Sequence, residues 1–117
     1  MFNFVIQLFP DFGLNSCLIN YYPSKLCTIP DHSDDEASIC DHSYIVTISL
    51  GASRRMIFKS KLNGNFLCSV SLTDGQILIF TKASQSLFTH GIPVTEQPDV
   101  DEYGPRISAT FRKLTQT

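Results

Sequence analysis

The tripeptide His32-Ser33-Asp34 combines two side-chain types that hold transition metals. In an extended segment, residues i and i+2 point to the same side, so the imidazole and the carboxylate face one point. His90 is the best candidate for a third ligand because it follows a strand-like segment. Two histidines and one carboxylate form the facial triad of non-haem iron(II) oxygenases, which leaves coordination positions open.

The tripeptide also has a simpler interpretation. A His-x-Asp sequence occurs by chance in many proteins, and a histidine in an acidic loop is usually a solvated surface residue. His42 is a competing histidine, because it follows Asp41 in the same loop. The tripeptide alone therefore leaves both a metal site and a solvated loop open.

The segment Arg106–Arg112 predicts a strand that carries two guanidinium groups on one face. Strict alternation places Arg106, Ser108, Thr110 and Arg112 on the same side. Two arginines that face a barrel interior need a partner. A dicarboxylate such as 2-oxoglutarate fits, because guanidinium grips carboxylates bidentately. The alternative is an edge strand with solvent-facing arginines.

A similar pattern occurs near the N-terminus. In the segment Cys17–Tyr22, alternation places Leu18, Asn20 and Tyr22 on one face. An inward asparagine and an inward tyrosine can hydrogen-bond the same dicarboxylate. An amphipathic strand with one solvated side explains the pattern equally well.

The elements that must position these residues are short strands separated by turn residues, which predicts an all-β protein. The expected strands are Ser16–Tyr22, Tyr44–Leu50, Arg55–Lys59, Phe66–Leu72, Gln76–Thr81 and Arg106–Arg112. Asn63-Gly64 and Asp74-Gly75 are hairpin-turn signals. Residues 23–43 and 82–105 are expected to be long loops, and Phe2, Val5, Ile6 and Phe9 predict a short amphipathic helix. Such a pattern suits a jelly roll.

Composition limits the classes of protein. The 117 residues are 43% hydrophobic and carry a net charge of −2, which suits one globular domain without an overall basic field. Nucleic-acid binding would therefore need a local basic patch or a second domain. The four cysteines lack paired spacing, and neither a signal peptide nor a membrane-spanning run is evident. An intracellular protein with free thiols is expected.

Read together, these segments resemble the AlkB-like family of iron(II)- and 2-oxoglutarate-dependent dioxygenases. The resemblance extends over about Asn15 to Lys113. It is carried by Asn15–Tyr22, His32–Glu36, Ile45–Gly51 with Arg54, Asp74-Gly75 with Ile77–Phe80, and the closing Arg106–Arg112. Each motif is weak by itself, but their order along the chain matches the family.

The resemblance implies a double-stranded β-helix in which His32, Asp34 and His90 hold iron(II), with 2-oxoglutarate and O2 as cosubstrates. It implies that Arg106 pairs with the distal carboxylate of 2-oxoglutarate, beside Tyr22 and Ser108. Some members have an asparagine where Ser108 stands. The remaining implied cosubstrate contacts are Arg112 and Asn20 at the metal-chelating end, and Ile45 and Thr47 along the pocket.

The implied reaction is oxidative demethylation of N-alkylated bases in DNA or RNA, with succinate, carbon dioxide and formaldehyde as products. The resemblance implies four substrate contacts: Asp35, Glu36, Leu18 and Arg54. Solvation in an acidic loop explains the two acids equally well, and Leu18 can instead be part of the core.

Relative to the family, the chain divides into an N-terminal extension, residues 1–14, and an oxygenase core, residues 15–117. The family usually has a nucleotide-gripping lid before the core, whereas about fifteen residues precede it here. Similar domains occur inside larger viral or mobile-element polyproteins, and such a parent would explain the short flank. Two alternatives stay open: an oxygenase of the same chemistry that acts on a protein or small molecule, and a non-catalytic β-barrel binding domain.

Overall fold

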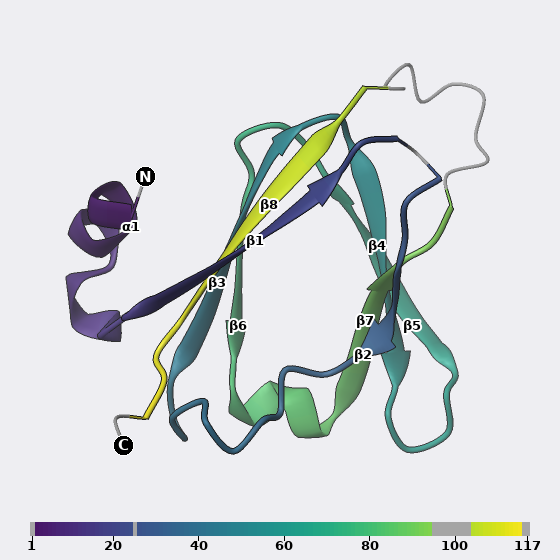
Figure 1. The fold of residues 1–117 in the computed structure, drawn as a ribbon. Coiled ribbons are helices and arrows are strands. Elements are labelled where there is room, and N and C mark those ends of the chain that lie inside the picture. Colours follow the sequence, from purple (N-terminus) through teal and green to yellow (C-terminus); the bar gives the residue numbers. More distant parts are fainter. Residues whose placement is uncertain (1, 25, 95–103, 116–117) are drawn as a thin grey trace.

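The computed structural model describes residues 2–24, 26–94 and 104–115. It contains eight strands, one α-helix and two short 3-10 helices (Figure 1). In chain order they are α1 (Phe2–Leu8), η1 (Pro10–Phe12), β1 (Ser16–Tyr22), β2 (Ile29–His32), β3 (Tyr44–Gly51), β4 (Arg54–Ser60), β5 (Phe66–Leu72), β6 (Ile77–Thr81), η2 (Ala83–Ser86), β7 (Phe88–Ile92) and β8 (Arg106–Arg112). In these ranges, no helix is long and apolar enough to cross a membrane.

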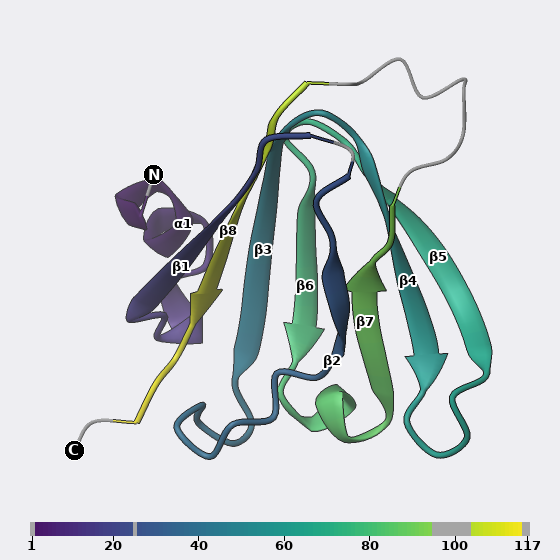
Figure 2. The same cartoon turned by 45° about the vertical axis from the view of Figure 1, so that its right-hand side comes forward.

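The strands form two antiparallel sheets that face each other (Figure 2). One sheet has the order β1-β8-β3-β6 and the other has the order β2-β7-β4-β5. Apart from the β4–β5 hairpin, each strand lies in the opposite sheet from the strand before it. This alternation winds the chain into a double-stranded β-helix, so the predicted all-β jelly roll is confirmed.

Buried apolar side chains lie on both faces of the first sheet. In β3, Ile45 points into the space between the sheets, where it packs with Tyr22 and Phe80. The alternate residues Val46 and Ile48 point the other way, toward α1. Both faces of β3 are covered, and its inward face becomes polar beyond Ile45, where Thr47 and Ser49 alternate with the outward apolar residues.

The short helix α1 confirms the predicted N-terminal helical segment. Val5 is fully buried against the outer face of the first sheet, and Phe9 packs beside it just after the helix ends. Ile6 is 37% exposed and does not belong to this apolar face, contrary to the expectation. The division between extension and core at residue 15 stays a prediction.

The prediction of loops at 23–43 and 82–105 was wrong in part, since these segments contain β2 and β7. Pro30 cannot donate to a sheet ladder, and the β2–β7 register shifts between Ile29 and His32. Gly91 lacks a side chain, and a Cβ there would lie 3.0 Å from the Ile29 carbonyl oxygen. Proline and glycine have low strand propensity, so β2 and β7 are not predicted from the sequence. In the structure, the same residues allow the two strands to lie close together. Residues 95–103 lie outside the described ranges.

The two turn signals have different outcomes. Asn63-Gly64 joins β4 to its partner β5, as predicted for a hairpin. Asp74-Gly75 joins β5 to β6, which belongs to the other sheet, so the hairpin expected there was wrong. Gly75 has a φ of 82°, and its N–H bonds the carbonyl of Ser49 at 2.7 Å. Asp74-Gly75, a dipeptide that favours hairpin turns, here forms the connection from one sheet to the other.

Candidate metal and cosubstrate site

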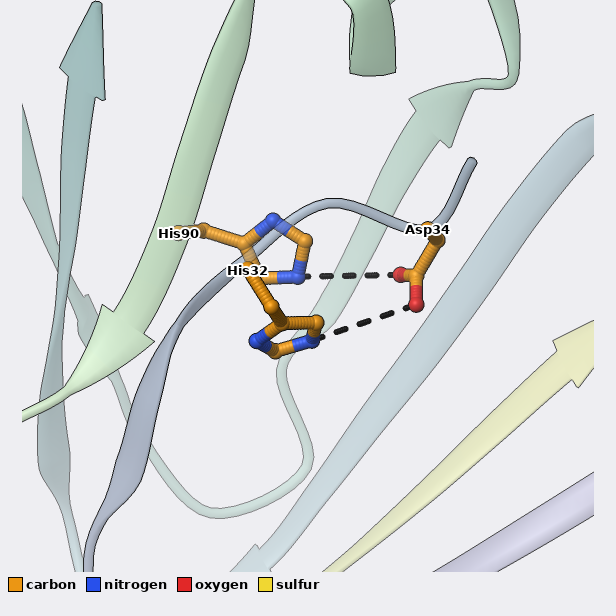
Figure 3. Close-up of side chains that lie close together, drawn as sticks. All are labelled: His32, Asp34 and His90. Carbon is orange, nitrogen blue, oxygen red and sulfur yellow. Dashed lines mark ion pairs between the residues drawn. The ribbon is translucent and has the colours of Figure 1, made fainter. Parts of the chain in front are cut away.

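The two histidines of the predicted triad are cross-strand neighbours. His32 at the end of β2 pairs with His90 in β7, and their ring centroids lie 4.4 Å apart. Asp34 follows two residues after the strand and turns back toward both rings (Figure 3). One ligand atom of each residue lies within 4.8 Å of the others. The sheet pairing therefore brings together two histidines that are 58 positions apart in sequence, and Asp34 joins them from the segment after β2.

The three side chains converge without a hydrogen bond between them. Nε2 of His32 lies 3.9 Å from Oδ1 of Asp34, and Nε2 of His90 lies 3.6 Å from Oδ2. Both distances exceed those of a hydrogen bond. Ligand atoms this close together that are not bonded to one another can share one metal ion.

A second contact prepares His32 to act as a ligand, whereas Nδ1 of His90 is buried without a hydrogen-bond partner among the described residues. Nδ1 of His32 lies 2.9 Å from the Pro30 carbonyl oxygen, which can only accept, so Nδ1 carries the proton and Nε2 is free to bind a metal. Burial, together with the nearby His32, lowers the pKa of His90 to about 4. His90 is therefore neutral at pH 7, the form that binds a metal.

Asp34 is held at both its side chain and its backbone. Nη2 of Arg112 donates a hydrogen bond to Oδ1 at 3.0 Å. The backbone N–H of Asp34 donates to Oε1 of Gln85 at 3.0 Å. No sequence pattern pointed to Gln85, which lies in a segment predicted to be a loop.

A cavity of about 260 Å³ extends from the triad between the two sheets. Of the predicted residues, it is lined by Leu18, Asn20, Tyr22, His32, Asp34, Thr47, His90, Arg106, Ser108 and Arg112. The β1–β8 ladder explains this grouping, because it pairs Leu18 with Thr110, Asn20 with Ser108, and Tyr22 with Arg106. The inward faces predicted separately for the two strands thus form one wall.

Arg106 supplies a buried positive charge to this cavity. It is 1% exposed, its Nη2 donates to Oγ of Ser49 at 2.9 Å, and its guanidinium lies 4.9 Å from the centre of the Tyr22 ring. Nε and Nη1 are buried without a hydrogen-bond partner in the described part of the chain. Burial lowers the pKa of Arg106, and the Tyr22 phenol opposes this shift. A guanidinium with unused donors fits a carboxylate.

Arg54 is buried inside the protein and does not lie on the surface that a nucleic acid would contact. It is 3% exposed, and its Nη2 donates to the Pro93 carbonyl at 2.7 Å. Its guanidinium also lies 6.0 Å from the Tyr22 ring. Neighbouring backbone carbonyls already bind this arginine inside the protein, so its burial argues against the predicted contact with the substrate, which stays a prediction.

The remaining residues predicted to contact the cosubstrate or the substrate lie in the core, at the surface or at the rim of the cavity. Ile45 belongs to the apolar core and not to the cavity lining. Asp35 is exposed and pairs with Lys61 at 2.9 Å, and Glu36 is exposed beside it. Leu18 lines the cavity while 46% exposed, so it lies at the rim. His42 is exposed and lies outside the triad.

Comparisons with known proteins agree with this geometry. The model of the 2OG-Fe(II) oxygenase superfamily matches residues 5–112. The human "DNA oxidative demethylase ALKBH2" is 28% identical over 88% of this chain and 41% of its own length. The bovine "Alpha-ketoglutarate-dependent dioxygenase alkB homolog 3" is 31% identical over 87% of this chain and 37% of its own.

A solved structure described as OsALKBH1 superposes with a TM-score of 0.65 and 27% identity, over 82% of this chain and 48% of that one. The chain thus spans less than half the length of the relatives it matches. These likenesses confirm the AlkB-like resemblance. Iron(II), 2-oxoglutarate and O2 are the cofactor and cosubstrates that the matched family uses. Because the family model covers most of its residues, the chain belongs to the 2OG-Fe(II) oxygenase superfamily.

Proposed function

We propose that this chain is the core of an AlkB-like iron(II)- and 2-oxoglutarate-dependent dioxygenase that demethylates N-alkylated bases in nucleic acid. The observation that carries the proposal is one cavity that holds a His-Asp-His cluster together with a buried guanidinium with unused donors. A metal cation and a dicarboxylate satisfy both features at once.

In this proposal His32, Asp34 and His90 hold iron(II). Arg106 binds the distal carboxylate of 2-oxoglutarate, with Tyr22 and Ser108 beside it. Arg112 and Asn20 lie toward the metal end, and Thr47 forms part of the wall. Ile45 supports the wall from the core instead of touching the cosubstrate.

Bound iron(II) supplies the activation of O2, in which oxidation of 2-oxoglutarate is coupled to oxidation of the substrate. The residues of the chain prepare the site for this step. The Pro30 carbonyl fixes the tautomer of His32, Arg112 balances the charge of Asp34, and burial keeps His90 neutral. Phe80 and Met56 line the cavity with apolar surface and limit the access of water.

The nucleic-acid substrate is supported by the relatives, one of which is named a DNA oxidative demethylase. Leu18 at the rim is placed to pack against a base. Asp35 and Glu36 follow the metal ligands directly, and Asp35 would have to exchange Lys61 for the substrate. We propose methylated single-stranded DNA or RNA as the partner, and an intracellular, reducing compartment that keeps the free cysteines reduced.

An oxygenase of the same chemistry with a protein or small-molecule substrate is the second candidate. Two lysines near the metal segment are neutralised, since Lys59 pairs with Asp31 at 2.7 Å and Lys61 pairs with Asp35. With a net charge of −2, a buried Arg54 and these two paired lysines, the described residues near the metal segment offer little free positive charge to phosphates. Any strong grip on nucleic acid would then come from a part of a longer polypeptide.

The proposal is tested by single-turnover incubation with iron(II), 2-oxoglutarate and an oligonucleotide that contains N1-methyladenine or N3-methylcytosine. The oligonucleotide mass and succinate are followed after air is admitted, with His32→Ala as the control. Loss of the methyl mass in the wild type alone supports the demethylase. Succinate without mass loss favours the second candidate, and neither product from folded protein contradicts an autonomous enzyme.

A further inference from the structure

Gln85 has no part in the mechanism proposed above, yet its side chain is completely buried. It lies in η2, immediately before β7, and its relative exposure is 0%. A buried amide must satisfy both its oxygen and its nitrogen. The partners of Gln85 therefore indicate why a polar residue is kept at this position.

The Gln85 amide bonds directly to the segment that carries the metal ligands. Oε1 accepts the backbone N–H of Asp34 at 3.0 Å, and Nε2 lies 3.4 Å from Oγ of Ser84. A backbone N–H can only donate, which settles which amide atom faces Asp34. The contact joins the helix before β7 to the chain after β2, and these two strands carry the histidines.

The backbone of Asp34 needs such a contact, because it lies two residues beyond the end of β2. The side chains of the neighbouring residues have other partners: Oγ of Ser33 donates to the Phe88 carbonyl at 2.8 Å, and Asp35 pairs with Lys61, which also donates to the backbone carbonyl of Gln85 at 3.2 Å. The amide side chain of Gln85 therefore contacts the backbone of Asp34, whereas the link from Gln85 to Asp35 runs through its backbone carbonyl and Lys61 and does not depend on the amide.

We propose that Gln85 is a positioning residue that fixes the backbone of Asp34 so that its carboxylate faces Nε2 of both histidines. The inference rests on the metal role proposed for His32, Asp34 and His90. Residues that orient metal ligands typically change metal affinity by about 10- to 100-fold when they are replaced. Gln85 differs from most such residues in holding the main chain of the ligand, while Arg112 holds its side chain.

The experiment measures Co(II) binding by calorimetry and by visible absorption, in the absence of 2-oxoglutarate and without turnover. Gln85→Met keeps the volume of the side chain and removes the acceptor, whereas Gln85→Glu restores an acceptor. Ser86→Ala is the matched control, because it removes one hydrogen bond from the same helix, to the Ala83 carbonyl at 2.9 Å, away from Asp34. Circular dichroism establishes that each variant is folded. Gln85→Asn, whose acceptor is one methylene shorter, replaces Gln85→Met if that variant does not fold.

We expect Gln85→Met to bind Co(II) about 10- to 100-fold more weakly, with absorption bands shifted toward those of Asp34→Ala. Gln85→Glu should recover most of the affinity, and Ser86→Ala should match the wild type. Wild-type affinity in folded Gln85→Met would overturn the positioning role alone. Failure of the wild type to bind Co(II), or unchanged binding in His90→Ala, would overturn the metal site and this inference together.

Discussion

Arg112 donates a hydrogen bond from Nη2 to Oδ1 of Asp34, and the two side chains are 18% and 7% exposed. The contact joins the last strand of the fold to the metal segment 78 residues earlier. It leaves Oδ2 facing His90 at 3.6 Å. The last strand thus orients the carboxylate while the β2–β7 pair places the histidines.

We expect Arg112→Met to destabilise the metal-free protein by about 3 kcal/mol, because it leaves the buried Asp34 carboxylate without a cation. Urea unfolding followed by circular dichroism measures the loss, since the chain contains no tryptophan. The double variant Asp34→Asn/Arg112→Met should regain part of the free energy of unfolding. If Arg112→Met and the double variant lose the same free energy of unfolding, the ion pair between Arg112 and Asp34 does not contribute significantly to stability.

Replacing Arg106 by methionine should abolish binding of 2-oxoglutarate without lowering the thermal stability of the protein. The variant removes a buried charge, so we expect unchanged or higher thermal stability. It also removes the unused donors, so calorimetric binding of 2-oxoglutarate to the Mn(II)-loaded protein should be lost. Arg55→Met, which removes an exposed arginine in β4, is the control. Wild-type cosubstrate affinity in Arg106→Met would exclude Arg106 as the carboxylate partner.

The pKa of His90 predicts a pH dependence of the metal-free protein. Burial, then His32, lowers this pKa from 6.5 to about 4. Between these values the unfolded state binds the proton more readily, so the contribution of His90 to stability is complete above pH 6.5 and is lost as the pH falls toward 4. Urea unfolding across this window should show a smaller pH slope in His90→Gln. Identical slopes would mean that His90 titrates normally in the folded protein.

Arg54 is expected to act on stability and not on nucleic-acid binding. Arg54→Met withdraws the donor from the Pro93 carbonyl and should cost about 1–3 kcal/mol in free energy of unfolding. The exposed Arg55 gives a matched control, and Arg55→Met should be nearly neutral. Fluorescence anisotropy with a labelled single-stranded oligonucleotide should find no larger loss for Arg54→Met than for Arg55→Met. A selective loss of oligonucleotide binding in folded Arg54→Met would support the predicted contact between Arg54 and the substrate.

Local sequence patterns predicted much of this protein. Alternation in Arg106–Arg112 and in Cys17–Tyr22 determines which side chains share a face, because the side-chain period of a strand is fixed by its backbone. The i and i+2 relation likewise predicted that His32 and Asp34 face one point. The family resemblance then joined these faces into one expected site, and the structure brings its metal and arginine residues together.

Only the tertiary structure decided which strands pair and which polar residues are buried. Pro30 and Gly91 obscured β2 and β7, whose pairing depends on contacts 58 residues apart in sequence. Asp74-Gly75 has the local chemistry of a hairpin, but the sheet that receives β6 depends on long-range packing. Arg54 and Gln85 are polar residues whose burial depends on partners in distant segments, the Pro93 carbonyl and the Asp34 backbone. Sequence thus determines the direction of side chains within an element, whereas contacts between elements determine what each side chain meets.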